Sequence, residues 1–256
     1  MKGGEMKICG LAAVRARFKR DASSIVRLYF DHPTSKRVGV MCRTLAAARK
    51  VYRCVEPAEL ERIADTVHHG GIVAVVEGRP PRTPTRADVA AWARRRENVV
   101  VLDHIGNAHN LGAIARTAGY FAVPRMVISG DAASAQPGTA AYRVAEGGLE
   151  ALEVWSVSEI AGFLRVLSAA GFDVVGAASS WGAAEISAAR HVGPWALVLG
   201  NEERGLSPEA HAACNRLVTI PGRGPVESLN VSVAAAIIVH ELSRADGRRQ
   251  GPGPQR

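Results

Sequence analysis

The chain has 256 residues, of which 47% are hydrophobic and 22% charged, a composition typical of a globular protein with one large or two modest domains. Its formal net charge is +8, but the charge is uneven along the chain. Residues 1–98 contain 20 Lys and Arg against 10 Asp and Glu, whereas residues 99–256 contain 12 against 14. A general bias toward arginine would not produce this asymmetry. The basic front part therefore favours a polyanionic partner such as a nucleic acid.

The cysteines and the N-terminus exclude several classes of protein. Cys9, Cys42, Cys54 and Cys214 are far apart, so neither a zinc knuckle nor a disulfide framework is indicated. The opening stretch MKGGEMKICGLAAVRARFKR has no sustained apolar run, and no other stretch is long enough for a transmembrane helix. We therefore expect a soluble, cytoplasmic protein with reduced thiols.

The front of the chain is expected to form a compact α/β unit, because helical and strand-like periodicities alternate there. The expected helices are residues 10–20, 44–50 and 57–67, and the expected strands are residues 23–30, 51–55 and 70–77. We assign residues 1–77 to this first domain. Residues 78–98 are rich in proline and arginine and are predicted to be a basic linker, with one or two helical turns between Val89 and Arg95.

Longer helices and strands alternate after the linker, which predicts an α/β domain with a parallel sheet covered on both faces. The expected strands are residues 98–105, 125–129, 172–179, 195–200 and 216–222. The expected helices are residues 110–123, 157–171, 207–215 and 230–245. Residues 99–245 are thus predicted to form the second domain. Residues 246–256 are rich in Gly, Pro and Arg and are expected to be a disordered tail.

Ligands of such sheets bind at the carboxyl ends of the strands, so the loops there are candidate sites. In the first loop, DHIGNAHNLGAIARTAGYF, Asn110 is a suitable N-cap for a helix whose apolar face leaves Arg116 pointing away. Gly112 and Ala113 would leave room for a ligand. Taken alone, this segment is explained more simply by a capping asparagine and a solvated arginine.

The second loop, LVLGNEERGLSPEA, follows an apolar strand that ends at Gly200. Gly200 and Gly205 permit a positive φ and a close approach of the backbone to a ligand. Asn201 and Glu202 lie between them. An acidic side chain in a loop that faces an anionic substrate would orient a partner arginine or a hydroxyl, and a solvent-facing glutamate in a polar turn is the alternative.

The third loop, TIPGRGPVESLNVSVAAAII, contains Gly222 and Gly224, but Pro225 follows and the third glycine of a dinucleotide fingerprint is missing. The chain has no Walker A motif either. We therefore interpret the segment as a loop that brings Ser228 and Asn230 to the start of a helix. Free amides and the helix dipole favour a bound anion at such a position.

Three motifs occur in order between Val99 and Leu242, namely N-x-G-A-I-x-R-T-A, L-G-N-E-x-x-G-L and I-P-G-x(5)-S-L-N-V-S-V-A. Together they resemble the three motifs of the SpoU/TrmH family of RNA 2′-O-ribose methyltransferases. The front domain is similar to the small ribosomal-protein-like RNA-binding domain that precedes the catalytic domain in this family. Its segments YFDHPTSKRVG and HHGGIVAVVE resemble in particular a YfiF-like branch.

The resemblance implies an S-adenosylmethionine-dependent enzyme with a C-terminal trefoil knot, which acts as a homodimer on tRNA or rRNA. The residues that it implies for the cofactor pocket are Gly200, Asn201, Ile220 and Leu229. The residues that it implies for catalysis are Arg116, Asn110, Glu202, Ser228 and Asn230. In these roles Asn110 would orient Arg116, and Glu202 would support the site. Ser228 and Asn230 would position the arginine or an RNA phosphate.

Methyl transfer to a ribose hydroxyl needs an in-line approach and help with the proton. The family resemblance implies that Arg116 takes the proton, although a guanidinium normally stays charged. Arg116 could instead remain cationic, stabilise the developing alkoxide and hold the neighbouring phosphate, which then accepts the proton. The sequence leaves both mechanisms open. Metal catalysis finds little support, because the histidines lack carboxylates or cysteines at ligand spacing.

The leading interpretation is a methyltransferase whose RNA, tRNA or rRNA, is held by the basic N-terminal domain and linker. A non-catalytic RNA-binding or ribosome-assembly factor that keeps the fold is the alternative. The presence of Arg116, Glu202, Ser228 and Asn230 argues against such a loss of activity. A nucleotide-dependent dehydrogenase is remote because the chain lacks G-x-G-x-x-G.

Overall fold

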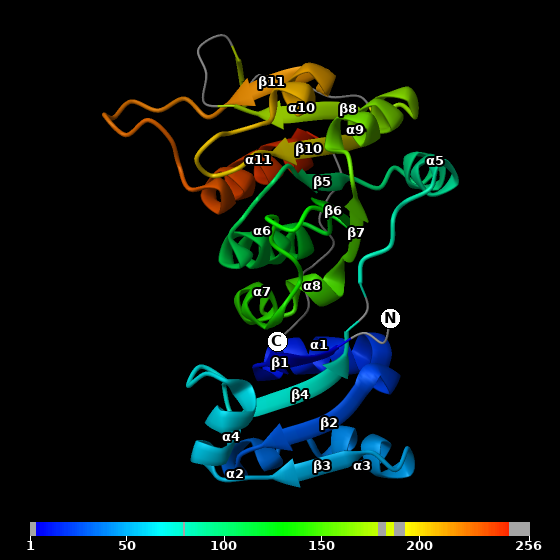
Figure 1. Ribbon diagram of the computed structural model, residues 1–256, viewed down its shortest axis with the longest axis vertical. Coiled ribbons are helices and arrows are strands. Elements are labelled where there is room, and N and C mark those ends of the chain that lie inside the picture. The colour runs from blue at the N-terminus through cyan, green and yellow to red at the C-terminus, as the bar shows by residue number, and fades with distance from the viewer. Residues whose placement is uncertain (1–3, 79, 179–182, 187–192, 246–256) are drawn as a thin grey trace. The chain divides into compact units, whose positions relative to one another are not determined.

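The structure, a computed structural model, describes residues 4–78, 80–178, 183–186 and 193–245. The chain forms two compact units, each built from separated segments (Figure 1). The first unit contains residues 1–82, 107–119 and 136–153, and the second contains residues 83–106, 120–135 and 154–256. The tail predicted at residues 246–256 lies outside the described residues. No helix within the described ranges is long and apolar enough to cross a lipid bilayer.

A four-stranded sheet forms the centre of the first unit, in the order β1-β4-β2-β3. Strands β2 and β3 are parallel, whereas β4 is antiparallel to both β1 and β2. The strands are β1 (Glu5–Cys9), β2 (Ile25–Phe30), β3 (Val51–Cys54) and β4 (Ile72–Glu77). The accompanying helices are α1 (Leu11–Asp21), the 3-10 turn η1 (Ala22–Ser24), α2 (His32–Ser35), α3 (Gly39–Ala47) and α4 (Pro57–Ala64). This arrangement confirms a small α/β sheet at the front of the chain.

Two elements of this sheet differ from the prediction. Strand β1 was not predicted, because it buries only Ile8 and Cys9 and is defined by its pairing with the distant strand β4. Helix α3 begins at Gly39, earlier than predicted. The earlier start places Met41 and Leu45 one turn apart, and both are buried.

A seven-stranded sheet forms the core of the second unit, in the order β7-β6-β5-β10-β8-β11-β9. The pairings from β6 across to β9 are parallel, as the sequence predicts. The strands are β5 (Val99–Leu102), β6 (Arg125–Ser129), β7 (Glu153–Val157), β8 (Asp173–Ala177), β9 (Ala184–Glu185), β10 (Trp195–Leu199) and β11 (Arg216–Thr219). This sheet supplies the strand ends at which the candidate loops lie.

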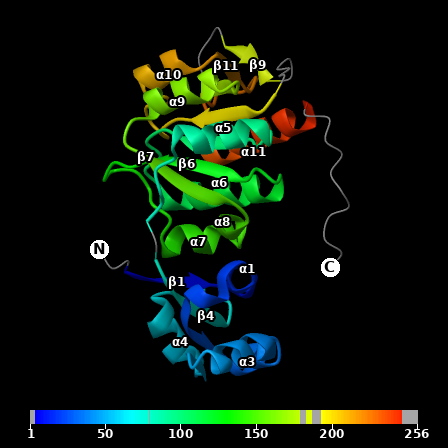
Figure 2. The same cartoon turned by 90° about the vertical axis from the view of Figure 1, so that its right-hand side faces the viewer.

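Helices cover the second sheet through a large apolar cluster. Trp92, Leu164 and Ala210, from three different helices, share this cluster with Val101 and Val198 of the sheet. The helices of the second unit are α5 (Arg86–Arg94), α9 (Ile160–Ala169), α10 (Pro208–Ala213) and α11 (Val231–Ala245). Helices α9 and α10 lie side by side (Figures 1 and 2), and α11 contacts β10. The second sheet therefore has a core of its own.

Helix α5 lies within the segment predicted to be a linker. It begins with a capping box, in which the Asp88 amide donates to Thr85 Oγ1 (3.2 Å) and the Thr85 amide donates to Asp88 Oδ2 (2.8 Å). Trp92 is fully buried, and its ring centroid lies 5.3 Å from that of Trp155. The Arg125 guanidinium lies 5.5 Å from the centroid of the Trp92 ring. Part of the predicted linker is thus packed into the core of the second unit.

Two helices of the first unit, α7 (Thr139–Ala145) and α8 (Gly148–Ala151), were not predicted, because they are only seven and four residues long. Helix α1 packs against both. Arg20 of α1 donates to the carbonyl oxygens of Leu149 (3.2 Å), Glu150 (3.0 Å) and Leu152 (2.7 Å), in and just after α8. Carbonyl groups at the end of a helix have no partner within the helix itself. Arg17 Nη2 lies 2.9 Å from Glu150 Oε1, and the Glu150 side chain is 1% exposed. Charged groups of α1 therefore hold α8.

Candidate active site

The loops that follow β5 and β10 lie beside each other. Leu102 and Leu199 are partners on these adjacent parallel strands, so both loops leave the same edge of the sheet. The side chain of Asn201 donates to the carbonyl oxygen of His104 at 2.9 Å. From β5 the chain continues to β6 on one side, whereas β10 lies on the other side. This edge is therefore a topological switch point, where parallel sheets bind their ligands.

A tight turn fixes the backbone after β10. Asn201 and Gly205 exchange two backbone hydrogen bonds of 2.9 Å. A Cβ atom on Gly200 would lie 2.2 Å from the carbonyl carbon of Gly205, and Gly205 itself has a φ of 70°. A side chain at Gly200 would therefore collide with backbone, and the positive φ expected in this loop is found at Gly205. The close approach at Gly200, however, is made by the chain's own backbone.

Glu202 is exposed, and its carboxylate reaches the loop that follows β5. Its Oε2 atom accepts hydrogen bonds from the Gly106 amide and from Asn201 Nδ2, both at 3.4 Å. These bonds are long, so they restrain the carboxylate only weakly. The side chain thus bends toward the neighbouring loop.

Asp103 is a buried residue of this edge that sequence reasoning missed. It follows four apolar residues of β5 and is 1% exposed. Its Oδ2 atom accepts a hydrogen bond of 2.7 Å from the Ser207 amide at the start of α10. Burial, together with the charge of Asp103, raises the pKa of Cys214 to about 12. An acidic residue directly after an apolar strand was the available signal for Asp103.

His104 and Asp131 connect the loops after β5 and β6. His104 Nδ1 lies 2.8 Å from Asp131 Oδ2. Burial alone would raise the pKa of Asp131, but hydrogen bonds from the Ser129 and Ser134 hydroxyls and from the Ala133 amide outweigh it, with His104 adding to their effect. The pKa of this carboxyl is therefore held well below its usual range. The hydrogen bonds make Asp131 the centre of an ordered loop at the edge of the site.

The loop between β11 and α11 is exposed, and hydrogen bonds to the described residues do not hold it in place. Residues 221–230 are exposed, and no hydrogen bond joins residues 220–229 to another residue within the described part of the chain. Leu229 is 49% exposed and Val226 is 77% exposed. Asn230 Oδ1 accepts hydrogen bonds from the amide (2.9 Å) and the hydroxyl (2.6 Å) of Ser232, and so caps α11. The predicted loop that brings Ser228 and Asn230 to a helix start is confirmed.

Asn110 is not the N-cap that the sequence suggested. Helix α6 (Ala108–Tyr120) starts two residues earlier, and Asn107 Oδ1 accepts a hydrogen bond of 2.8 Å from the His109 amide. Asn107 is also a good capping residue, and the prediction passed over it in favour of the asparagine next to the apolar run. Asn110 is instead buried in the first turn. A separation of six residues also places Asn110 and Arg116 about 120° apart around the helix, on different faces.

Gly112 has a packing role and leaves no room for a ligand, contrary to the prediction. A Cβ atom at this position would lie 2.5 Å from the carbonyl oxygen of Ala141 on α7. Gly148 of α8 approaches α6 in the same way, because its Cβ atom would lie 2.6 Å from the Arg116 Cα atom. The small residues around Arg116 therefore allow α6, α7 and α8 to pack closely.

Arg116 is exposed on α6, as predicted, and forms an ion pair that the sequence did not reveal. Its Nη2 atom lies 3.0 Å from Glu146 Oε2, and the two side chains are 58% and 57% exposed. Glu146 ends α7 with a left-handed φ of 45°, and Gly147 follows with a φ of 98°. Two consecutive left-handed residues turn the chain there, a conformation that glycine adopts easily and glutamate rarely.

The candidate residues divide between the two units. Asn110 and Arg116 belong to the first unit. The others, all in the second unit, are Gly200, Asn201, Glu202, Ile220, Ser228, Leu229 and Asn230. Within the second unit the structure joins Asn201 and Glu202 to the loop after β5, and it places Ser228, Leu229 and Asn230 together before α11.

Comparisons with known proteins match both parts of the chain. The SpoU rRNA Methylase family matches residues 97–240. A second family, described as RNA 2′-O ribose methyltransferase substrate binding, matches residues 7–82. The first match alone covers more than half of the chain and contains all three motifs.

Curated relatives extend over nearly the whole chain. An uncharacterized tRNA/rRNA methyltransferase, YfiF, from Escherichia coli O157:H7 is 33% identical over 243 residues, which cover 94% of this chain and 68% of the relative. The 23S rRNA (guanosine-2′-O-)-methyltransferase RlmB from Nitrosomonas europaea is 31% identical over 249 residues, or 96% of this chain and 94% of the relative. Both parts of the chain are thus present in the same order in these relatives.

Solved structures show the same fold. An AdoMet-bound rRNA methyltransferase from Sinorhizobium meliloti matches with a TM-score of 0.76 at 24% identity, over 96% of this chain and 88% of that chain. The SpoU methyltransferase AviRb from Streptomyces viridochromogenes, in complex with AdoMet, matches with a TM-score of 0.74 at 23% identity, over 95% and 91%. The motifs, the family matches and the fold agree: the chain belongs to the SpoU family of RNA 2′-O-ribose methyltransferases.

Proposed function

We propose that this chain transfers a methyl group from S-adenosylmethionine to a ribose 2′-hydroxyl of rRNA or tRNA. The observation that carries this proposal is the loop of residues 220–229, which follows a parallel strand and leaves its backbone groups without hydrogen-bond partners among the described residues. Free backbone groups at this edge of a sheet are suited to bind a nucleoside. The same loop carries the third motif of the family.

The proposed cofactor residues fit such a ligand. Ile220 and Leu229 offer apolar side chains beside free backbone groups, and Leu229 is half exposed. Gly200 and Asn201 supply a rigid backbone turn at the end of β10. S-adenosylmethionine, when bound, supplies an electrophilic methyl carbon. The remaining requirements, which are orientation, exclusion of water and charge stabilisation, fall to the protein.

Arg116 is proposed to act as a cation. Its guanidinium forms an ion pair with Glu146 at 3.0 Å, which supports a charged side chain over one that acts as a base. A guanidinium can hold the phosphate next to the target ribose and stabilise the alkoxide that develops as the hydroxyl loses its proton. Glu146 is then a positioning residue, because it limits where the guanidinium points.

The other catalytic candidates are assigned supporting roles. Asn110 is buried in α6 and is proposed to fix that helix, and thereby the position of Arg116. Glu202 is proposed to orient a polar group at the edge of β5 and β10. Ser228 is exposed and available to a phosphate, and Asn230 fixes the start of α11 beside it.

A trefoil knot and a homodimer are further parts of this proposal. The likeness to SpoU methyltransferase structures and the contact of α11 with β10 support a knot made by the C-terminal segment. Apolar side chains of the second unit that stay exposed support a homodimer, namely Tyr120, Val226, Leu229 and Val233. Light scattering coupled to gel filtration measures the dimer directly, and a monomeric mass at micromolar concentration would contradict it.

The proposed division of labour gives RNA binding to residues 1–77 and the basic linker 78–98, and chemistry to residues 99–245. The substrate-binding family match over residues 7–82 supports the first assignment. A cytoplasmic location follows from the proposed RNA substrates.

Calorimetry with the full chain tests the cofactor assignment. We expect S-adenosylmethionine to bind both the unchanged protein and Arg116→Ala with similar affinity, because Arg116 is assigned to the RNA. No binding to the unchanged protein would contradict the proposal. Binding of cofactor without transfer to rRNA or tRNA would favour the non-catalytic alternative.

A further inference from the structure

One edge of the first unit combines positive charge with an absence of acids. Residues 32–55 contain six Lys and Arg and no Asp or Glu, and they form α2, α3 and β3. Residues 56–78, which form α4 and β4, contain five Asp and Glu and a single Arg. The charge around the N-terminal sheet is therefore separated rather than mixed.

Most of these cations have no carboxylate partner among the described residues. Arg37, Arg43, Arg49 and Arg53 are exposed and form no ion pair with any residue that the structure describes. Lys50 differs, because its ammonium donates to the Ile25 carbonyl oxygen at 2.7 Å and so has a structural role. Unpaired cations in one region repel one another, and a bound polyanion would relieve that repulsion.

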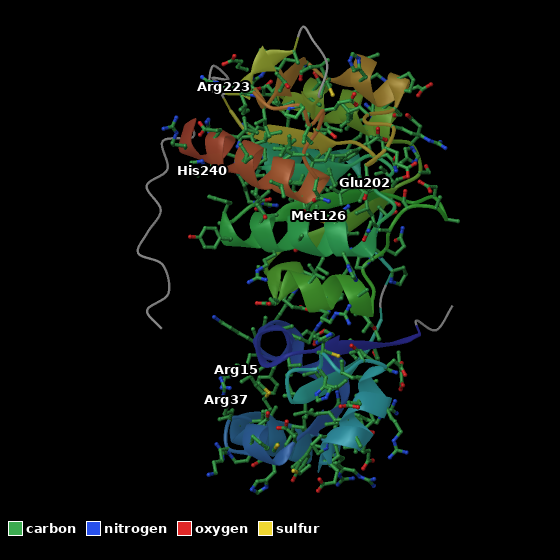
Figure 3. The ribbon with its side chains drawn as sticks, turned by 90° about the vertical axis from the view of Figure 1, so that its left-hand side faces the viewer. Arg15, Arg37, Met126, Glu202, Arg223 and His240 are labelled. Carbon is green, nitrogen blue, oxygen red and sulfur yellow. The ribbon has the colours of Figure 1, made fainter. Side chains whose placement is uncertain are left out.

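Arg15 adds a cation from α1 to the same region. Its Nη2 atom donates to the carbonyl oxygen of Arg37 at 3.3 Å. Figure 3 shows the two side chains close together on one side of the first unit. Neither guanidinium forms an ion pair with a carboxylate in the part of the chain that the structure describes. Two such neighbouring guanidiniums are suited to phosphate oxygens, which accept paired hydrogen bonds from arginine.

Strand β3 contributes an aromatic side chain to this surface. It is the edge strand of its sheet, and all four of its residues are exposed. Tyr52 is 41% exposed and Val51 is 44% exposed. Arg49 and Arg53 lie within three residues of Tyr52 in the sequence. The exposed aromatic ring offers a stacking surface for an unpaired base.

We propose that a basic edge, formed by Arg15, Arg37, Arg43, Arg49, Tyr52 and Arg53, binds the substrate RNA. The arginines contact phosphates, and Tyr52 stacks on a base that is not in a duplex. This inference rests on the proposed function and adds to it the surface that holds the RNA. Cations on an edge strand can also prevent two copies of a chain from pairing through that strand. The test therefore also measures the oligomeric state.

The test compares two triple variants of the full chain that lose the same charge. One is Arg37→Gln/Arg43→Gln/Arg53→Gln, and the control is Arg62→Gln/Arg165→Gln/Arg244→Gln, in which all three arginines are exposed and lie outside the basic edge. The probe is a fluorescein-labelled RNA hairpin with a single-stranded loop, followed by anisotropy. The first variant should lose about tenfold or more in affinity for the RNA. The slope of log K against log salt concentration should become shallower by about two, as expected for the loss of about two phosphate contacts. The control should stay within about twofold.

Tyr52 is tested separately. Tyr52→Ala should weaken RNA binding by about fivefold or more, and Tyr52→Phe should retain most of the affinity because the ring remains. Equal losses in both triple variants, or unchanged binding in the first, would overturn the basic edge. A change in oligomeric state without a change in RNA affinity would assign the edge to strand protection instead. Cofactor binding, measured in parallel, should be the same in all variants, and its absence everywhere would count against the proposed function rather than the basic edge.

Discussion

The guanidinium of Arg116 lies 3.0 Å from the carboxylate of Glu146, where α7 ends in a left-handed turn. Each side chain is more than half exposed. Exposed ion pairs contribute roughly 0–1 kcal/mol to stability, so this pair has little effect on folding. Its consequence is geometric, because it limits the directions available to the guanidinium proposed to meet the RNA.

Replacing Glu146 with glutamine should therefore slow catalysis while leaving the fold intact. We expect kcat to fall about tenfold, with the melting temperature and cofactor affinity nearly unchanged, because the guanidinium loses its orientation. Steady-state kinetics and a thermal scan measure both effects. Glu59→Gln, which removes an exposed carboxylate from α4, is the matched control and should behave like the unchanged protein. If kcat of Glu146→Gln matched that of the control, Glu146 would not position Arg116.

Three glycine variants test the turn after β10. Gly200→Ala should disrupt it, because the new Cβ atom would lie 2.2 Å from backbone, and we expect at least a tenfold loss of cofactor affinity. Gly205→Ala has open space but a φ of 70°, and it should cost about 1 kcal/mol of stability. Gly4→Ala, outside the loops of the site, has neither restriction and should behave like the unchanged protein. Calorimetry measures the cofactor affinity and urea unfolding measures the stability. If all three variants gave the same values, the turn after β10 would not have the proposed role.

Glu150 should be important for the stability of the first unit. Its side chain is 1% exposed and lies 2.9 Å from Arg17, although the buried oxygens make no well-aligned hydrogen bond in the described structure. Burial raises the pKa of Glu150, and Arg17 and Arg20 oppose that shift. Removing one member of a buried pair leaves an uncompensated charge, so Glu150→Ala should cost about 3 kcal/mol or more.

Urea unfolding measures this cost, and Arg244→Ala is the control. Arg244 pairs with Glu241 at 3.1 Å, but its side chain is 71% exposed. The control should therefore change stability by less than about 0.5 kcal/mol. Similar costs for Glu150→Ala and Arg244→Ala would contradict the buried contact between α1 and α8.

The cysteines should differ sharply in reactivity. Burial and the charge of Asp103 raise the pKa of Cys214 to about 12, so at pH 8.5 only about one molecule in a thousand or fewer carries the thiolate that iodoacetamide attacks. Cys54 is exposed on β3. Mass spectrometry after brief alkylation should find Cys54 modified and Cys214 intact. Labelling of Cys214 at the same rate as Cys54 would mean that solvent and iodoacetamide reach Cys214, and so would contradict its burial beside Asp103.

Much of the fold could be predicted from the sequence, because apolar residues that recur with a regular period identify the longer helices and the buried strands. The alternation after residue 98 predicted the parallel strands β5, β6, β8, β10 and β11, and the helix that became α11. Short elements were missed. Strand β1 depends on its distant partner β4, and helix α8, with four residues, has no period to detect.

The parts of the site whose residues lie in one loop could be predicted from the sequence. The parts whose residues are far apart in the sequence and are brought together by helix packing could not. Ser228 and Asn230 are neighbours in the sequence and in space, and the helix start that they form was foreseen. Glu146 lies 30 residues from Arg116 and reaches it only because α6 and α7 pack through Gly112. Asn110 was placed wrongly because two asparagines, three residues apart, were both suitable caps.

The most direct test of the proposed function is the transfer of tritiated methyl groups from S-adenosylmethionine to rRNA and tRNA by the purified full chain, followed by alkaline hydrolysis. A 2′-O-methyl group removes the hydroxyl that attacks the neighbouring phosphate, so the label should appear in alkali-resistant dinucleotides. Arg116→Ala should transfer none. Label recovered only in mononucleotides would place the methyl group on a base, and no transfer to either RNA would show that the chain is not the proposed enzyme.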